Sequence, residues 1–164
     1  MYIAFKISAR YAHFRKFYTS ASPLSYKFPP PTVIRGMVAA MMGYGEDYNE
    51  RLDAVGFLPA GVKTLTDYDS IQLSLNNIEI KDLSKINMKT VHANRIIYEY
   101  LKDQSWLIYV MANDKSFMNE LTQRLIDKEF VYPVYCGQAQ CFAEVEYVGM
   151  TDAFEPDTIN MIDD

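Results

Sequence analysis

An α+β fold with the element order strand, helix, strand, strand, helix, strand is predicted by three features of this 164-residue sequence. Several segments alternate apolar and polar residues, as strands with one buried face do. Two other segments repeat their apolar residues with the period of an amphipathic helix. About half of the residues (49%) are apolar, which at this length is typical of one domain with a substantial core.

The N-terminal part of the chain is predicted to form one strand and one helix, joined by a long loop. Residues 2–8 alternate cleanly and indicate the strand. Residues 9–28 follow neither period, which indicates the loop. Three consecutive prolines end that loop. We expect the helix to run to Met42, with Thr32 as its N-cap and Gly43 as its C-cap.

Three strands are predicted in the middle of the chain. Residues 69–80 alternate, but the phase of the alternation shifts at Asn76-Asn77, which predicts a bulge or a bend. Residues 94–101 and 105–112 are rich in aromatic and β-branched side chains. They flank the turn-like segment Lys102-Asp103-Gln104, so we expect these two runs to form a hairpin.

The C-terminal part completes the pattern with a helix and a strand. Asp114 can cap a helix over residues 115–128, and residues 139–148 alternate as a last strand. Apart from one additional strand in the middle, this is the ferredoxin-like βαββαβ pattern, which RNA-recognition modules share. The predicted fold is a βαββαβ core with an inserted thumb-like loop or hairpin. We therefore expect one domain over residues 1–148, followed by an acidic, frayed tail over residues 149–164.

The charge of the chain is distributed very unevenly. Its net charge of −5 by itself argues against a nucleic-acid partner. Residues 1–45, however, hold six of the 16 Lys and Arg residues and none of the 21 Asp and Glu residues, so this segment carries +6 and the remainder −11. A basic segment on an acidic body can bind a polyanion locally. An acid-free stretch of this length can also arise by chance.

The basic segment is also rich in aromatic side chains. Single-stranded RNA is held by cations on its phosphates and by rings stacked on its bases, and the loop 10–18 supplies both. The alternative is a loop whose aromatics, Phe14 and Phe17 above all, pack into the core while its charges are solvated. The candidate RNA-binding residues of this segment are Arg10, His13, Arg15, Lys16, Tyr18, Tyr26 and Lys27.

Arg35 is a further candidate because it falls in the first turn of the predicted helix. The helix dipole disfavours a cation there by up to roughly 1 kcal/mol. A phosphate bound at the helix start would explain the residue, since helix N-termini bind anions. A solvated Arg that tolerates the small cost explains it equally well.

Signals for an enzyme are weak. The sequence contains neither a phosphate-binding P-loop nor an H-E-x-x-H motif, and Gly43-Tyr44-Gly45 is too short for a dinucleotide site. His13, His92, Cys136 and Cys141 could be combined into a zinc site, but packed thiols are the simpler interpretation. Metal-free RNA cleavage could use His13, Tyr26, Lys27 and His92, although nothing in the sequence brings them together. We expect neither a metal nor a cofactor.

The same composition argues against a membrane protein. The longest apolar runs are too short to cross a bilayer, and the N-terminus lacks the continuous apolar stretch of a signal peptide. Two cysteines are too few for a disulfide framework and suit a reducing compartment, so a cytoplasmic location is expected.

Two segments resemble a known family. Ala12-His13-Phe14-Arg15, then Tyr26-x-Phe28-Pro29-Pro30 and Arg35-Gly36-Met37, resemble the N-terminal signature of CRISPR-associated protein 5, a RAMP-superfamily subunit of type I Cascade complexes. The segment from Tyr132 to Cys141 resembles the Gly-containing turn before the last core strand of that family. Together these resemblances cover roughly residues 1–148.

The resemblance implies a ferredoxin-like RAMP core that binds the 5′ handle of the mature crRNA and caps that end of the complex. It implies a thumb inserted between core strands, for which residues 81–95 are the best position, with Lys85 and Lys89 as further RNA contacts. The partners that it implies are the crRNA, the backbone subunit (CRISPR-associated protein 7) and the large Cascade subunit.

One subgroup of the family, in type I-C systems, also cuts precursor RNA with a Tyr and a nearby Lys-His pair. Tyr26 matches the Tyr, but His92 stands between Val91 and Ala93, so the pair is absent. We therefore expect a non-catalytic RNA-binding subunit of another subtype. A metal-independent endoribonuclease that uses Tyr26 and His92, and an interaction scaffold without an RNA role, remain as alternatives.

Overall fold

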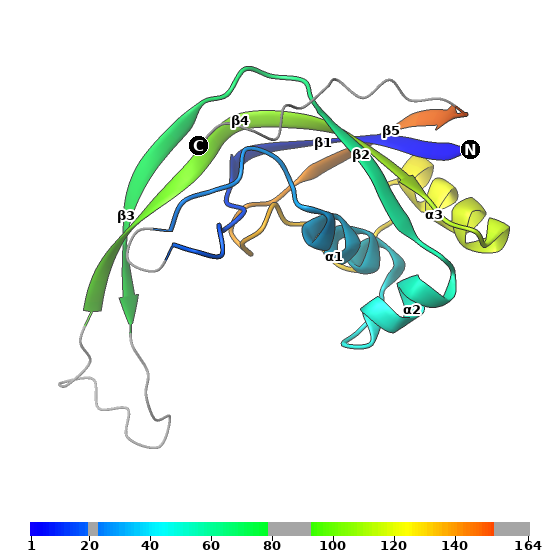
Figure 1. Cartoon of the computed structure of the whole chain (residues 1–164), viewed down its shortest axis with the longest axis horizontal. Coiled ribbons are helices and arrows are strands. Elements are labelled where there is room, and N and C mark those ends of the chain that lie inside the picture. Colours follow the sequence, from blue (N-terminus) through cyan, green and yellow to red (C-terminus); the bar gives the residue numbers. More distant parts are fainter. Residues whose placement is uncertain (20–22, 79–92, 153–164) are drawn as a thin grey trace.

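The computed structural model describes residues 1–19, 23–78 and 93–152, which form an antiparallel sheet with helices on one face (Figure 1). In chain order the elements are β1 (Tyr2–Ala12), α1 (Pro31–Met42), α2 (Tyr48–Ala54), β2 (Leu58–Thr64), β3 (Ser70–Ile78), β4 (Ala93–Met111), α3 (Lys115–Asp127) and β5 (Glu144–Thr151). The α+β class predicted from the sequence is confirmed.

The sheet has the strand order β2-β4-β1-β5, and β3 also pairs with β4. If α2 and β3 are set aside, the elements follow the predicted order of strand, helix, strand, strand, helix, strand. The second strand of that order is β2, which the sequence did not reveal. The segment predicted for that place forms β3 instead.

The long strand β4 extends beyond the rest of the sheet. Residues Leu101–Val110 pair with β1, whereas Ala93–Leu101 pair with β3. Leu101 pairs with both Ala12 and Ser70, so β3 follows β2 along the same edge of β4. The paired strands β3 and β4 therefore project from the domain as an arm (Figure 1).

Two expectations for this region are wrong. The predicted hairpin at Lys102-Asp103-Gln104 is a continuous part of β4, because β1 lies alongside and pairs with both Lys102 and Gln104. Asp103 adopts a φ of 50° without interrupting that register. The predicted bulge at Asn76-Asn77 is also absent from the part of β3 that the structure describes, since both residues keep their pairing with β4.

Helix boundaries were predicted more closely than strand boundaries. Gly43 is the C-cap of α1, with a φ of 76°, but the helix begins at Pro31 with Pro30 as its N-cap, two residues before the predicted N-cap Thr32. Asp114 caps α3, and its Oδ1 accepts hydrogen bonds from the backbone N–H groups of Ser116 and Phe117 at 2.7 and 3.1 Å.

The two ends of the sheet also differ from the prediction. β1 continues to Ala12, into the segment expected to be loop. β5 runs from Glu144 to Thr151 rather than from 139 to 148. Residues 153–164, which include most of the expected tail, lie outside the described residues, as do positions 81–92 of the expected thumb.

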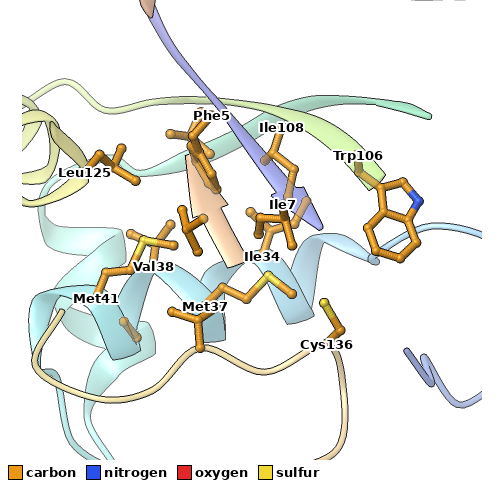
Figure 2. Packing of buried hydrophobic residues seen from close by; sticks show 14 of the residues in the cluster. Phe5, Ile7, Ile34, Met37, Val38, Met41, Trp106, Ile108, Leu125 and Cys136 are labelled. Atoms are coloured by element: carbon orange, nitrogen blue, oxygen red, sulfur yellow. The ribbon is translucent and has the colours of Figure 1, made fainter. Parts of the chain in front are cut away.

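The core lies between the sheet and the helices α1 and α3 (Figure 2). Each buried aliphatic side chain stabilises the folded state by about 1.5–3 kcal/mol. The side chains that are fully excluded from solvent include Phe5, Ile7, Ile34, Val38, Met41, Trp106, Ile108 and Leu121. No helix within the described residues is both long and apolar enough to span a bilayer.

Candidate functional site

A pocket of about 710 Å³ opens between the loop that follows β1 and the start of α1. Its wall unites three segments that are distant in the sequence: residues 13–17, residues 26–33, and the turn at Gly137-Gln138. The first two are the aromatic and basic segments that the sequence singled out. The third segment lies more than 100 positions further along the chain than the other two and lines the same pocket.

The loop before α1 has its own hydrogen-bonded structure. The N–H of Tyr26 donates to the carbonyl oxygen of Phe14 at 2.8 Å, and the N–H of Lys16 donates to that of Leu24 at 2.9 Å. Arg15 and Ser25 form the bridge between these pairs. The two halves of the loop thus pair with each other, although the sequence there does not alternate as a strand does.

Glu99, on the arm half of β4, holds this loop in place. Its Oε2 accepts a hydrogen bond from the N–H of Ser25 at 2.8 Å, and its backbone N–H donates to Pro23 at 3.0 Å. The hydroxyl of Tyr68 donates to its other carboxylate oxygen at 2.9 Å. Charge-assisted bonds of this kind are stronger than neutral ones, so one carboxylate ties the loop to the sheet.

Trp106 supports the loop from below. Its ring is fully buried and packs edge-on against Phe14, with ring centroids 5.4 Å apart. Its indole N–H donates to the carbonyl oxygen of Lys27 at 3.2 Å. Trp106 therefore fills the core beneath the loop and also fixes the loop backbone at Lys27.

The turn at Gly137 closes the pocket from the other side. The N–H of His13 donates to the carbonyl oxygen of Cys136 at 3.0 Å. Gly137 has a φ of 91°, and a Cβ at this position would overlap the carbonyl oxygen of His13. Only a glycine fits both requirements, which explains why a Gly-containing turn stands here.

His13 is buried in the wall of the pocket, with 2% of its surface exposed. Its Nδ1 lies 2.7 Å from the carbonyl oxygen of Glu99, so Nδ1 carries the proton, because a carbonyl can only accept. The rings of Tyr98 and Tyr100 contact it, each at 5.5 Å between centroids. Burial is the main cause that lowers the pKa of His13 below 6.5, and neutral histidine is therefore favoured.

A pH-dependent loss of stability follows from this burial. Because the pKa of His13 is lower in the folded than in the unfolded chain, the unfolded chain binds its proton more readily. The free energy of unfolding should therefore fall as the pH drops below 6.5 toward the folded pKa. We expect His13→Asn, whose amide can still donate to Glu99, to show a weaker dependence between pH 7.5 and 5.5. Urea denaturation at several pH values measures this, and parallel curves would contradict it.

Four predicted RNA contacts lie on the surface around the loop. Arg10, Arg15 and Lys27 are exposed, Lys16 is half-buried, and none of the four forms a salt bridge with a described residue. The Nζ of Lys16 lies 5.9 Å from the ring centroid of Tyr26, and the Nζ of Lys27 lies 5.2 Å from that of Tyr68. Lys16 and Lys27 therefore stand beside aromatic rings rather than beside carboxylates.

Arg35 is placed differently from what its position in the sequence suggested. The helix begins earlier than predicted, so Arg35 lies in the second turn of α1, where the dipole argument for a bound anion no longer applies. Its guanidinium lies 2.7 Å from Asp53 and donates to both the side chain and the carbonyl oxygen of Asn49. Arg35 joins α1 to α2, and its RNA contact stays a prediction.

The aromatic residues of the loop divide into two groups. Phe14 is buried, as the core interpretation expected, but Phe17 is 87% exposed, contrary to that interpretation. Tyr18 is also exposed, and Tyr26 is half-buried in the pocket wall. Phe28 and Gly137-Gln138 belong to the two segments that resemble the family but were not predicted as site residues, and Glu99 was not predicted because no local pattern marks it.

The alternative sites predicted from the sequence are only partly described. Lys85, Lys89 and His92 lie outside the described residues, so the pair of Tyr26 and His92 stays a prediction. Cys136 and Cys141 are free, buried thiols. Burial raises the pKa of Cys136 to about 12. Within the described ranges, no three or more His, Cys, Asp or Glu side chains are grouped to hold a metal ion.

Comparison with protein families gives one match over nearly the whole chain. Residues 2–161 match the model of a family described as CRISPR-associated protein (Cas_Cas5). No curated protein matches the sequence significantly.

Solved structures share the fold at low sequence identity. The chain is similar to a functionally uncharacterized protein from Streptococcus mutans (TM-score 0.54, 15% identity, 91% of this chain covered) and to a Cas protein (0.57, 15%, 94%). It is also similar to a chain of a CRISPR RNA-guided surveillance complex (0.62, 11%, 88%). The match covers 67%, 67% and 60% of those three chains, so this chain spans about two thirds of their length or less.

Proposed function

Since the chain belongs to the family of CRISPR-associated Cas5 proteins, we propose that it is a non-catalytic subunit that binds the 5′ handle of a crRNA within a type I surveillance complex. The observation that carries this proposal is the pocket lined by residues 13–17 and 26–33, beside which the surface cations Arg15 and Lys27 lack acidic partners among the described residues. Phosphates of a single strand would meet Arg15 and Lys27, and its bases would meet the rings between them.

The wider assembly is part of the same proposal. One structural neighbour is a chain of a CRISPR RNA-guided surveillance complex, and a family member that binds the end of the crRNA would contact the backbone subunit and the large subunit. Sequence recognition of the target would then come from base pairing of the guide, not from this protein.

Salt dependence of RNA binding tests the proposal. A handle-length RNA is titrated with the protein at increasing salt, and log K is plotted against log salt. Each phosphate contact to a single strand contributes about −0.7 to the slope. The double variant Arg15→Gln/Lys27→Gln should therefore bind more weakly and flatten the slope by about 1.4.

The matched control is Lys115→Gln/Lys128→Gln, which removes the same charge from two exposed positions at the ends of α3, outside the pocket. Its slope should equal that of the unsubstituted protein. A slope near zero for the unsubstituted protein, or equal flattening in both variants, would refute the proposed RNA site.

A further inference from the structure

We propose that Phe17 is a stacking platform for one unstacked nucleobase, which enters the pocket between Phe17 and the start of α1. This inference rests on the proposed function and specifies what part of the RNA the pocket takes. Phe17 lines the pocket and yet is 87% exposed. Burying a phenylalanine side chain is worth about 1.5–3 kcal/mol, so a partner that covers this ring would gain part of that free energy.

The exposed position of Phe17 is fixed by the turn that carries it. The hydroxyl of Thr19 donates to the carbonyl oxygen of Lys16 at 2.9 Å, and the N–H of Leu24 donates to that hydroxyl at 3.3 Å. The guanidinium of Arg15 donates to the carbonyl oxygen of Thr19 at 3.2 Å. Phe17 therefore stands at the tip of a tied turn, which reduces the ordering cost of binding.

Within the part of the chain that the structure describes, the ring of Phe17 has one aromatic neighbour, and that contact is at an edge. Tyr18 lies perpendicular to it, with centroids 5.2 Å apart. A perpendicular neighbour does not occupy the ring in the way a stacked one would, and the high exposure of Phe17 leaves ring surface for a planar partner. A nucleobase is such a partner. Removal of an aromatic side chain on which one base stacks weakens nucleic-acid binding about tenfold.

The rest of the pocket suits a nucleotide better than an apolar peptide. Its volume of about 710 Å³ lies within the ~300–1,000 Å³ typical of small-molecule sites. Tyr26 and Phe28 add further rings, and Arg15 adds a cation at the rim. An apolar side chain would satisfy the rings but not the cation, whereas a base with its phosphate satisfies both.

Stacking makes little distinction among bases, since every base has a planar face. The proposal therefore predicts one position in the RNA at which any of the four bases supports tight binding, whereas an abasic nucleotide weakens binding. The experiment moves an abasic nucleotide through a handle-length RNA. One position should weaken binding about 5-fold or more to the unsubstituted protein, and Phe17→Ala should remove that sensitivity.

Two further variants complete the test. Phe17→Trp, which keeps a stacking ring, should retain both affinity and the sensitive position. Phe142→Ala removes another exposed phenylalanine, 65% exposed and outside the pocket, and should change neither. Because Phe17 is exposed, Phe17→Ala should leave the melting temperature unchanged, so weaker binding would not reflect unfolding.

The possible failures are distinguishable. If RNA binds with the expected salt slope but no abasic position matters, or Phe17→Ala binds as tightly as the parent, the stacking proposal is wrong and the RNA site stands. If RNA does not bind at all, the proposed function fails and the stacking proposal with it. If Phe17→Ala weakens only the binding of another protein subunit, the pocket is a protein-docking site and the stacking proposal is wrong.

Discussion

Gly137→Ala is expected to destabilise the protein by about 3 kcal/mol. A side chain at a φ of 91° costs roughly 1–2 kcal/mol, and the new Cβ would also displace the backbone carbonyl of His13, which adds a similar amount. The melting temperature should fall by about 6–12 °C for a chain of this size. Differential scanning calorimetry measures the change directly.

Gly36→Ala is the matched control for this exchange. Gly36 lies within α1, and a Cβ there meets no other atom within 4 Å. Alanine in a helix is favoured over glycine by about 0.5–1 kcal/mol, so the same substitution should raise the melting temperature slightly. Equal effects of the two exchanges would show that the turn at Gly137 does not contact His13 as described.

Trp106→Ala should be the most damaging exchange in the core near the pocket. Its ring is fully buried, and truncation of a buried tryptophan costs about 3–5 kcal/mol. The variant also leaves the carbonyl oxygen of Lys27 without its donor. Urea denaturation followed by circular dichroism is suitable, because Trp106 is the only tryptophan and the variant has no tryptophan fluorescence to follow.

A milder pair of variants separates packing from the support of the loop. Trp106→Phe keeps a buried ring but removes the N–H that binds Lys27. Ile108→Val, two residues further along β4, removes one buried methyl group at a cost of about 0.5–1.5 kcal/mol. Only Trp106→Phe should speed the hydrogen exchange of loop amides such as that of Tyr26. Equal exchange in both variants would contradict a role of Trp106 in holding the loop.

The parts of the fold that the sequence predicted correctly are those with local causes. Gly43 and Asp114 mark the ends of helices because their conformation or side chain acts within one turn. The buried stripe of α3, with Leu121 and Leu125, is likewise set by helical spacing. Such features need no knowledge of what lies across the sheet.

The errors have non-local causes. β2 contains Pro59 and Gly61, which weaken the strand pattern, and it is a strand because β4 lies beside it. The residues Lys102-Asp103-Gln104 have the composition of a turn, but pairing with β1 keeps them extended. Neither partner strand is visible in the local sequence.

The candidate site shows the same division. The basic and aromatic loop could be found from its composition, and the structure places four of its residues, His13, Phe14, Arg15 and Phe17, in the lining of one pocket. Arg10, Lys16, Tyr18 and Lys27 are not among the residues that line it. The helix-dipole argument for Arg35 failed because the helix begins earlier than predicted, and the guanidinium pairs with Asp53, 18 positions away. The tie from Ser25 to Glu99 spans 74 positions, and no local pattern indicates it.

The continuity of β4 gives the molecule a mechanical property. A strand of 19 residues spans roughly 60 Å when extended, and its two halves belong to the arm and to the domain. Glu99 lies on the arm half and is bonded to the loop at Ser25 and Pro23. The carbonyl oxygen of Glu99 also accepts a hydrogen bond from His13, which lines the pocket. A displacement of the arm would therefore be transmitted through Glu99 both to the loop and to the pocket wall.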